Sequence, residues 1–523
     1  MTRAPAAKIA GAAALITVLT VLARIAGFGR TFVFLHTVGD GGLGDIYNAA
    51  NTIPNIVFEL VAGGALAGLV VPLLAGAVAA GDRERVNAVS SALLTWVLVL
   101  LVPLAVLVAL LAGPIAGLFD VPAAHQQTAA SMLRVFAPQL PLYGVGIVLT
   151  GVLQAHHRFA WPVIAPLLSS VTVMGAYLSY AAVDGAGTGF TGLTRTGELL
   201  LSVGTTCGVV VLALCLLIPL RRLRLRLRPA LRFPGDAGRR AVRLGWAGAV
   251  TVGSQQLMTI TAIALATGDN GDLTRYNAAQ TVFLLPWAVL AVPVATAVYP
   301  SLSAAAAQGD EPAYREALSA TARTVMLLAG LGAAALIAVA GPAAVLLDAA
   351  PASSGIVGFA PGLLGYALFA LLSRALYARG ATAAAAFAAA VGWVVAAGSA
   401  LALMTLGPHL LVFGLGLANS IGMTVIGLLL VLAVRRHAGA AALGGLGRTT
   451  LVTVLAGGLA AFAGWGVAAG LGNLLGPTPQ VAGSVVQGIL GGLAVLVVFV
   501  GVVYPLARHD LAPLARRLRR RSA

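Results

Sequence analysis

The sequence predicts an all-α integral membrane protein with about fourteen transmembrane helices, arranged as two parallel six-helix lobes plus two C-terminal helices. Three observations carry this prediction: the composition, the spacing of the apolar runs and an internal repeat. Of the 523 residues, 59% are hydrophobic and only 9% are charged, whereas a soluble protein carries roughly 25% charged residues. Each span needs about 20 mainly apolar residues, so the chain has room for a dozen or more.

Apolar runs separated by turn-rich and charged segments give the predicted spans in order. They are 9–36, 45–79, 88–119, 128–155, 160–183, 196–220, 241–267, 273–305, 317–347, 357–379, 382–406, 409–434, 449–472 and 481–507. The second and eighth runs are long and contain Pro54 and Pro286, which predict kinks that act as hinges. Gly27 and Gly29 predict a further hinge in the first span.

The basic residues alternate between the predicted loops and indicate the orientation. Arginines cluster in the even-numbered connections and in the C-terminal tail, whereas the other connections carry Arg195 as their one clear basic residue. Cytoplasmic loops are the ones enriched in Lys and Arg. Both termini are therefore predicted to lie in the cytoplasm.

An internal repeat divides the chain. "GDGGLGDIYNAANT" (39–52) matches "GDNGDLTRYNAAQT" (268–281) at an offset of 229, and "FAPQLPLYG" (136–144) matches "FAPGLLGYA" (359–367) at an offset of 223. Six spans per copy give both copies the same orientation, and parallel repeats of this kind form transporters. The predicted divisions are an N-lobe (1–220), a basic cytoplasmic linker (221–240), a C-lobe (241–434) and two extra helices with a basic tail (435–523).

Five polar residues mark one face of the second span. Asp45, Asn48, Thr52, Asn55 and Glu59 follow one another at spacings of three and four residues, which keeps them on one side of a helix. Such a stripe is predicted to face another helix or a water-filled cavity rather than lipid.

Two arginines, Arg24 and Arg30, lie in the first span. Their spacing of six residues separates them by about 9 Å along a helix and by about 120° around it. A central arginine costs roughly 2.5–3.5 kcal/mol, so both need partners or water. One explanation is a pair of buried ion pairs with Asp45 or Glu59. The favoured one is a cationic site for an anionic substrate, since guanidinium groups match phosphate oxygens.

The residue inventory argues against several other functions. Lys8 is the only lysine, which removes the usual P-loop ATPase and Schiff-base chemistries. The seven histidines have no metal-ligand spacing. We therefore expect a transporter rather than an enzyme, with no cofactor. The net charge of +16 does not indicate nucleic-acid binding, because no soluble domain presents it. The arginine-rich segment 221–243 is either an ordinary linker or a surface for anionic lipids.

"ARIAGFGRTF" (23–32), "GDIYNAANTIPN" (44–55) and "GGALAGLVVP" (63–72) resemble the MurJ/MviN family of lipid II flippases, within the multidrug/oligosaccharidyl-lipid/polysaccharide exporter superfamily. The resemblance implies alternating-access movement of an undecaprenyl-diphosphate-linked sugar-peptide from the inner to the outer leaflet of the bacterial plasma membrane, for peptidoglycan and cell-wall synthesis. It also implies a monomer driven by membrane potential or an ion gradient, with cell-wall synthesis proteins as possible partners.

The same resemblance assigns roles to residues. It implies that Arg24 and Arg30 recognise the diphosphate-sugar headgroup, and it matches Asp45 to a family acid. The family's basic pair after the second-span proline is replaced here by Phe58-Glu59, and its eighth-span arginine falls near Gln280. The substrate-binding residues are thus predicted to be Arg24, Arg30, Asn48, Thr52 and Asn55, with gating or coupling by Asp45 and Glu59.

Two alternatives stay open at the level of sequence. One is a superfamily relative that exports another polyprenyl-linked glycan or a cationic drug, which the acidic Glu59 favours. The other is a non-transporting scaffold for cell-wall enzymes, for which the cavity charges are dispensable and the arginine-rich loop is not.

Overall fold

The protein is built from helices. The computed structural model describes residues 4–223, 225–233, 237–268, 270–475 and 481–519, and every regular element in those ranges is a helix. The chain forms two compact units, residues 1–274 and residues 275–523, called here the N-terminal and C-terminal units. Their boundary lies within the predicted C-lobe, so the lobe limits inferred from the repeat stay predictions.

The described residues account for most of the predicted membrane spans. In the described residues, eleven helices are long and apolar enough to cross a bilayer, and a twelfth results if Ala352–Phe359 and Gly362–Ala378, bent by 51° from one another, are taken as one span. The number fourteen is therefore not confirmed. The predicted spans 9–36 and 45–79 both contain side chains outside the described part of the chain.

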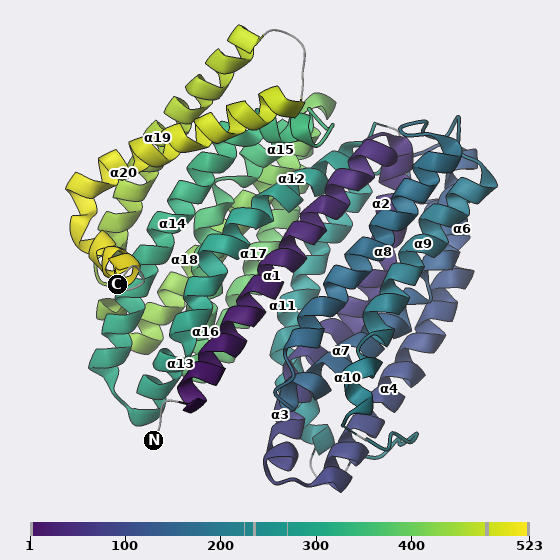
Figure 1. Ribbon diagram of the computed structural model, residues 1–523, viewed down its shortest axis with the longest axis horizontal. Helices are drawn as coiled ribbons and strands as arrows, with labels where there is room; N and C mark the ends of the chain where they lie inside the picture. Colours follow the sequence, from purple (N-terminus) through teal and green to yellow (C-terminus); the bar gives the residue numbers. More distant parts are fainter. Residues whose placement is uncertain (1–3, 224, 234–236, 269, 476–480, 520–523) are drawn as a thin grey trace. The chain divides into compact units, whose positions relative to one another are not determined.

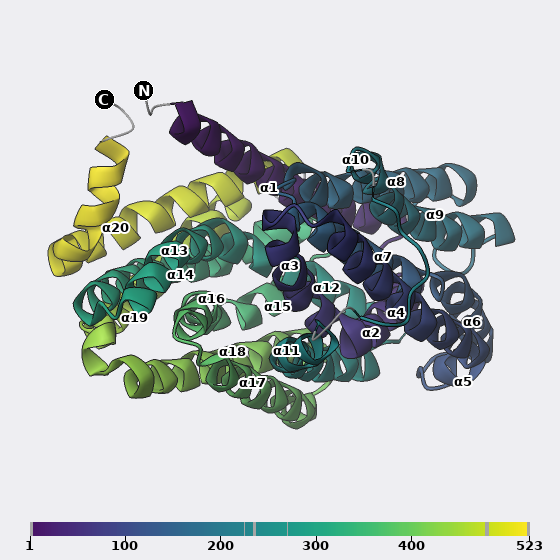
Figure 2. The same cartoon turned by 90° about the horizontal axis from the view of Figure 1, so that it is seen from below.

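The N-terminal unit contains helices that follow one another with short loops. They are α1 (Ala4–Thr37), α2 (Gly42–Phe58), the π-helix η1 (Glu59–Gly63), α3 (Gly64–Ala79), α4 (Arg83–Leu110), α5 (Ala112–Ala116), α6 (Ala123–Phe136), α7 (Gln139–Ala155), α8 (Ala160–Asp184), α9 (Arg195–Leu214), α10 (Leu217–Arg221) and α11 (Ala237–Ala266). Helix α8 packs between α1 and α9 (Figures 1 and 2), and α11 packs on α3. The first helix after the basic linker thus belongs to this unit.

The C-terminal unit begins within α12. Its elements are α12 (Asp272–Pro286), the π-helix η2 (Trp287–Ala291), α13 (Val292–Gln308), α14 (Glu311–Leu346), α15 (Ala352–Phe359), α16 (Gly362–Ala378), α17 (Thr382–Leu403), η3 (Met404–Leu406), η4 (Pro408–Leu410), α18 (Leu411–Ala438), η5 (Ala440–Leu443), α19 (Leu446–Leu475) and α20 (Val481–Arg519). The helices predicted to lie outside the repeat, α19 and α20, pack against each other and against α14 (Figure 1).

The same aromatic contacts occur once inside each unit. Tyr47 packs on Phe136 at 5.7 Å between ring centroids, and Tyr276 packs on Phe359 at 5.5 Å. These four residues correspond at the offsets of 229 and 223 found in the sequence. Aromatic pairs at such separations add to the stability gained from burial. The sequence repeat is therefore also a repeat of packing.

A second aromatic pair also recurs at equivalent positions of the two units. Phe58 lies 5.7 Å from Tyr143 in the N-terminal unit, and their counterparts Trp287 and Tyr366 stack at 4.7 Å in the C-terminal unit. Phe58 directly precedes η1 and Trp287 begins η2. Each unit thus fixes an aromatic ring beside its π-helical segment.

The π-helices lie at matching places in the two long helical segments. Segment η1 begins five residues after Pro54, and η2 begins directly after Pro286. Proline removes a hydrogen-bond donor from a helix, and π-turns are a recognised site of helix deformation. Both segments that were predicted to kink therefore depart from α-helical geometry, while α1 continues as a regular helix through Gly27 and Gly29.

Equivalent aspartates cap the N-termini of the helices that follow the two repeated segments. Asp82 accepts a hydrogen bond from the N–H of Arg85 at the start of α4, and Asp310 accepts one from Ala313 at the start of α14. Side chains of this type satisfy the free N–H groups of a helix start. In each case the preceding glycine has a left-handed φ, 69° and 70° respectively, a conformation that glycine adopts without strain.

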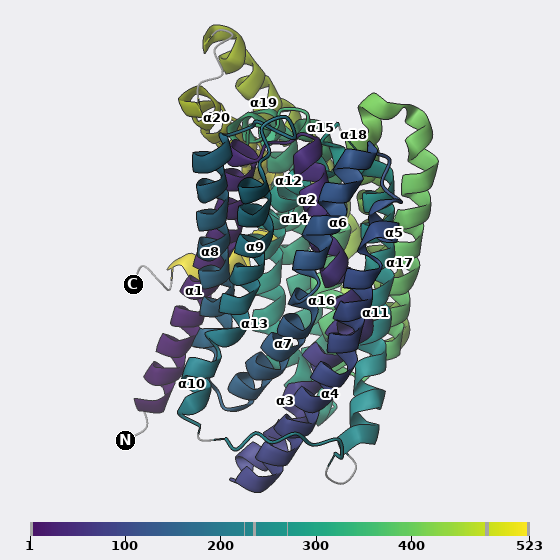
Figure 3. The same ribbon diagram turned by 90° about the vertical axis from the view of Figure 1, so that its right-hand side faces the viewer.

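The described part of the basic linker is an extended segment on α4. The backbone N–H groups of Arg226, Arg228 and Ala230 donate to side chains four residues apart on α4, Asn87 Oδ1 (3.1 Å), Ser91 Oγ (3.0 Å) and Thr95 Oγ1 (2.9 Å) respectively. Every second residue of an extended chain advances about 6.6 Å, close to the 6 Å of four helical residues. Figure 3 shows this segment, called here the linker strap (225–233), near the lower end of α4.

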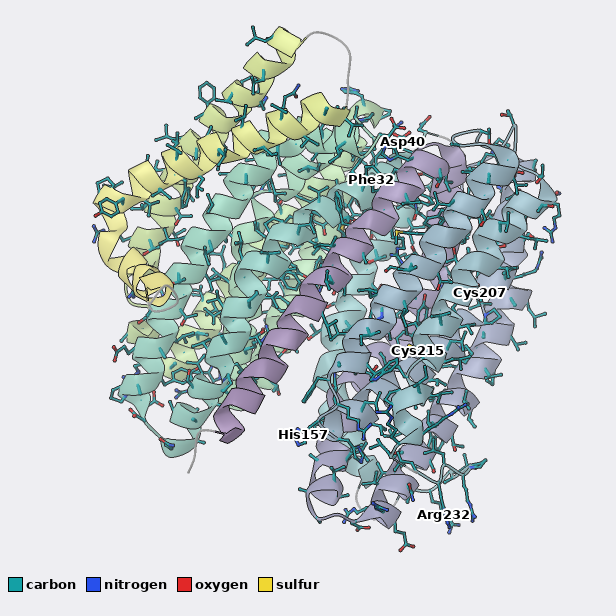
Figure 4. All side chains as sticks on the ribbon, in the orientation of Figure 1. Phe32, Asp40, His157, Cys207, Cys215 and Arg232 are labelled. Carbon is teal, nitrogen blue, oxygen red and sulfur yellow. The ribbon has the colours of Figure 1, made fainter. Side chains whose placement is uncertain are left out.

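The loops of the N-terminal unit lie at the two opposite ends of its helices. Figure 4 shows His157 and Arg232 at one end of this unit and Asp40 at the other. The first two belong to connections predicted to be cytoplasmic, and Asp40 belongs to one predicted to be external. The arrangement keeps the predicted sides apart, while the orientation of the termini stays a prediction.

Candidate functional site

The polar stripe of α2 divides into residues with different surroundings. Asp45 is fully buried, at 0% exposure, whereas Asn55 is exposed and Glu59 is half-buried in η1. Thr52 donates its hydroxyl to the carbonyl of Asn48 at 2.7 Å, the ordinary bond of a threonine to its own helix. The stripe therefore does not present all five side chains to one space.

Asp45 lies against the first turn of α12. Its Oδ1 accepts a hydrogen bond from the backbone N–H of Thr274 at 2.8 Å. Asn48 Nδ2 donates to Thr274 Oγ1 at 3.0 Å, so one residue receives two contacts from α2. A carboxylate near a helix N-terminus satisfies a free N–H and is favoured by the helix dipole. Asp45 Oδ2 has no partner of acceptable geometry in the described part of the chain.

The loops that precede α2 and α12 approach each other at backbone distance. A Cβ added to Gly271, whose φ is +83°, would lie 1.4 Å from the carbonyl oxygen of Asp40. A Cβ on Gly44 would lie 2.6 Å from the carbonyl of Gly39 and 3.0 Å from Thr274 Oγ1. Only glycine permits this approach. The two repeat-related loops thus form a close-packed junction around Asp45.

Arg24 and Arg30 are both exposed on α1. Neither makes an ion pair with a described residue, and Glu59 makes none either. Asp45 already binds the start of α12. The buried ion pairs that would explain the arginines as purely structural are thus not formed in this conformation, and both guanidinium groups are available.

Arg30 lies beside a cluster of tyrosines that the sequence did not single out. It interacts electrostatically with the hydroxyls of Tyr47, Tyr143 and Tyr177. Tyr47 Oη lies 2.8 Å from Tyr177 Oη and 2.6 Å from Thr205 Oγ1. The signal for this cluster was Tyr47 itself, which recurs as Tyr276 in the second "YNAA" motif. Tyr47 and Tyr177 are buried, so this polar cluster lies in the core of the N-terminal unit.

An apolar groove lies in the C-terminal unit beside η2. It has a volume of about 390 Å³ and is lined by residues of α12, η2, α14 and α20, including Pro286, Leu290 and Val495. Its lining is almost wholly aliphatic. Such a groove suits a hydrocarbon chain.

Comparison with known proteins identifies the family. The family model described as "Lipid II flippase MurJ" matches residues 34–473. The chain belongs to the lipid II flippase MurJ family. The MurJ match covers both copies of the "YNAA" motif, α14 to α18 and nearly all of α19. Because this family consists of transporters of the membrane, the coarse prediction of a multi-pass bacterial membrane protein is confirmed.

Curated MurJ relatives agree with the family match. The chain is 28% identical over 387 residues to the lipid II flippase MurJ of Burkholderia cenocepacia, covering 70% of this chain and 73% of that protein. It is 26% identical over 367 residues to the probable lipid II flippase MurJ of Rhizobium meliloti, covering 67% and 66%. The matched segment thus spans about two thirds of the length of the Rhizobium relative.

Solved structures share the fold. A lipid II flippase MurJ in an inward closed conformation superposes with a TM-score of 0.73 at 18% identity, covering 94% of this chain and 99% of that one. An inward-facing multidrug resistance MATE transporter of the MOP superfamily gives a TM-score of 0.62 at 18% identity, covering 81% and 94%. The predicted membership of the MurJ fold is therefore confirmed, and the MATE likeness concerns the fold alone.

The described residues contain no candidate metal-binding site. No group of three or more His, Cys, Asp or Glu side chains lies close enough to hold a metal ion there. The acidic side chains of α2 and η1 are instead separated, since Asp45 is buried against α12 and Glu59 lies nearly four helical turns away along the chain.

Proposed function

We propose that this chain moves lipid II from the inner to the outer leaflet of the plasma membrane by alternating access. The observation that carries the proposal is the pair of exposed arginines on α1 without a described acidic partner, in a chain of the MurJ family. A membrane helix does not keep two unpaired guanidinium groups without a role, since each is costly in hydrocarbon. An anionic headgroup supplies the missing counter-charge.

The headgroup chemistry fits arginine better than lysine. The diphosphate of lipid II presents several oxygens, and a guanidinium donates two parallel hydrogen bonds to such a group. Arg24 and Arg30 point in different directions around α1, so they contact different parts of a large headgroup. Asn48, Thr52 and Asn55 are proposed as further polar contacts for the sugars.

Asp45 is proposed to act as a gate. In the conformation described here it holds Thr274 at the start of α12. Release of this bond would free a buried carboxylate that already has one unsatisfied oxygen, and such a group readily takes a new partner. Exchange of Asp45 between Thr274 and a cation would couple the loop junction to the occupancy of the site. The π-segments η1 and η2 are proposed to take up the bending, together with Gly27 and Gly29.

The driving force is proposed to be the membrane potential or an ion gradient, with no ATP hydrolysis by the chain itself. The single lysine, Lys8, supports this, because a P-loop requires a lysine after its glycine-rich turn. Glu59, half-buried in η1 and without an ion pair among the described residues, is the proposed site for a coupling proton or cation. The isoprenoid tail is proposed to follow the aliphatic groove beside η2.

The remaining features of the proposal concern the surroundings of the protein. Both termini are proposed to lie in the cytoplasm, and the chain to work as a monomer with cell-wall synthesis proteins as partners. The arginines of the segment 221–243 are proposed to face anionic lipid headgroups. The exposure of Arg226 and Arg228 on the linker strap supports this, because their backbone, not their side chains, binds α4.

The test uses a strain depleted of its own flippase and carrying this chain. Lipid II on the outer face is measured by its cleavage with an added impermeant enzyme. Arg24→Ala and Arg30→Ala are each expected to lower exposure about ten-fold, the loss that corresponds to one charge-assisted hydrogen bond. Arg24→Lys is expected to restore only part of it. Arg83→Ala, an exposed arginine at the start of α4, is the matched control.

Three results would overturn the proposal. Full lipid II exposure in the double variant Arg24→Ala/Arg30→Ala, at equal protein level, would remove the arginine site. Failure of the unaltered chain to support growth, with export of a cationic dye instead, would favour the drug-exporting relative. Growth supported by the double variant but lost on deletion of the linker strap would favour the scaffold.

A further inference from the structure

A second cavity of the C-terminal unit lies on a different set of helices from the groove beside η2. It is a cavity of about 600 Å³ lined by α14, α16, α18 and α19. Helix α14 packs on α16 and α19, and α16 packs on α18 (Figure 1). This volume is within the range of sites that hold a small organic molecule. Nothing in the proposed flippase mechanism uses it.

The wall of the cavity is mainly apolar, and eight of its lining residues are glycine or alanine. They are Gly330, Ala333, Ala334, Gly365, Gly427, Gly447, Gly457 and Gly458. Along α19 the lining extends from Leu446 to Gly458, and along α18 from Thr424 to Arg435. At 1.5 Å per residue these stretches measure about 16–18 Å. One leaflet of the hydrocarbon core is about 15 Å deep, so the cavity has the length of an acyl chain.

One end of the cavity carries positive charge. Arg435 is the one charged residue among the described residues that line it. The mouth lies where α18 ends and α19 begins, so Leu446 and Gly447 bring the positive end of the α19 dipole to the same place. Arg435 is exposed and makes no ion pair with a described residue. The mouth therefore favours an anionic group.

A buried hydroxyl inside the cavity has no partner. Thr453 lines the cavity and is 0% exposed, and its Oγ1 makes no hydrogen bond in the described part of the chain. Its neighbour Thr450 instead bonds the carbonyl of Leu446 at 2.9 Å. Thr453 lies about 10 Å along α19 from its start. Because its Oγ1 has practically no accessible surface, a ligand in the cavity packs past the Thr453 side chain without bonding to it.

We propose that this cavity binds one acyl chain of an anionic phospholipid, with the lipid phosphate against Arg435 at the mouth and the chain extending along α19. Water does not fill a cavity with so apolar a wall, whereas hydrocarbon does. Basic pockets between membrane helices on the cytoplasmic side bind anionic lipid headgroups. The arginine-rich end of this unit is the one that the positive-inside rule assigns to that side. The lipid therefore comes from the cytoplasmic leaflet, and the site is independent of the proposed flippase function.

The test is mass spectrometry of the intact, full-length protein in detergent, titrated with dioleoyl phosphatidylglycerol. Dioleoyl phosphatidylcholine has the same chains without the net negative charge, and oleate has the chain and charge without the phosphate. We expect one tightly bound phosphatidylglycerol, with phosphatidylcholine about five-fold weaker, the effect of one cationic residue near an anionic lipid. Oleate binding as tightly as phosphatidylglycerol would overturn the assignment to a phospholipid.

Matched variants locate the site. Arg435→Gln is expected to weaken phosphatidylglycerol about five-fold and to leave phosphatidylcholine unchanged, whereas Arg436→Gln, an adjacent arginine outside the lining, leaves both unchanged. Gly458→Phe fills the cavity at a position where a Cβ meets nothing within 4 Å, and it is expected to abolish tight binding. Gly466→Phe lies on the same helix, also has open space, and does not line the cavity.

The outcome that overturns the proposal is clear for each pair. Equal effects of Arg435→Gln and Arg436→Gln would show that the head is not bound at the mouth. Tight binding retained by Gly458→Phe would place the chain elsewhere. If Gly458→Phe does not fold, the arginine pair decides alone, because both of its members are exposed.

Discussion

Asp45 accepts a hydrogen bond from the backbone N–H of Thr274, the residue that holds its own position in the second copy of the repeat. Gly44, the residue before Asp45, also closely approaches Thr274 Oγ1. The junction around Asp45 therefore joins the start of α2 to the start of α12, two equivalent points of the repeated sequence.

Loss of the Asp45 carboxylate is expected to weaken this junction. Asp45→Ala removes a buried acceptor from Thr274 and should destabilise the protein by about 1.5–3 kcal/mol, the range for hydrogen bonds to charged groups. Asp45→Asn keeps a neutral acceptor and should cost less. The measurement is the thermal unfolding midpoint of the purified protein, together with growth of the depleted strain. Asp120→Asn, on an exposed loop residue, is the control, and an Asp45→Ala protein that unfolds and functions like the wild type would contradict the role.

The glycine at 271 is expected to tolerate no side chain. Gly271→Ala would place a Cβ 1.4 Å from the Asp40 carbonyl at a φ of +83°. The left-handed conformation alone costs roughly 1–2 kcal/mol for an L-residue, and the overlap forces the loops apart. Gly268→Ala lies in the same loop with nothing within 4 Å and serves as the control. We expect Gly271→Ala to lower the unfolding midpoint and the yield, and equal midpoints for the two variants would show that the loops separate freely.

The sequence was sufficient for the helices, the repeat and the interrupted segments, because these depend on local patterns. Pro54 and Pro286 predicted the irregular places beside η1 and η2. The partner of Asp45 could not be predicted in this way, since Thr274 is 229 residues distant and a backbone N–H leaves no trace in residue type. The polar stripe left open whether Asp45 faces another helix or a cavity, and the structure buries Asp45 completely against the start of α12.

The linker is a second case in which the sequence predicts the local conformation but not the tertiary contact. Alternating arginine and leucine has a period of two, which is typical of an extended chain, and the segment is indeed extended over 225–233. Its hydrogen-bond partners on α4 are spaced by four and lie in a predicted span, where Ser91 and Thr95 would pass as ordinary helix residues. The sequence does not reveal which helix supplies the hydrogen-bond acceptors for the linker, because this depends on how the helices pack. The site arginines, Arg24 and Arg30, were predicted as residues, while their roles await the lipid II assay.

The tyrosine cluster is expected to contribute to stability through Tyr47. Tyr47→Phe removes the hydroxyl that contacts Tyr177 and Thr205 at 2.8 and 2.6 Å. With two buried partners left unsatisfied, the expected loss in free energy of unfolding is about 1–3 kcal/mol. Tyr504→Phe, at an exposed tyrosine on α20, should change the unfolding midpoint little. Equal midpoints for both variants would mean that Tyr177 and Thr205 re-pair with each other without cost.

The linker strap is expected to depend on three side chains of α4. The triple variant Asn87→Ala/Ser91→Ala/Thr95→Val removes the acceptors of the N–H groups of Arg226, Arg228 and Ala230. Cleavage by a protease requires local release of the backbone, so trypsin should cut after Arg226 about ten-fold faster, as expected for the loss of at least one net hydrogen bond. The control is Ser90→Ala, since Ser90 is buried on the same helix and its Oγ has no partner in the described residues. Cleavage is followed by mass spectrometry of the fragments. Trp96 Nε1 on α4 also donates to the carbonyl of Leu231 at 2.9 Å, and Leu225 and Phe233 pack against the core of the N-terminal unit. An unchanged rate in the triple variant would therefore mean that these remaining contacts hold the strap, and that the three-bond ladder only sets its register.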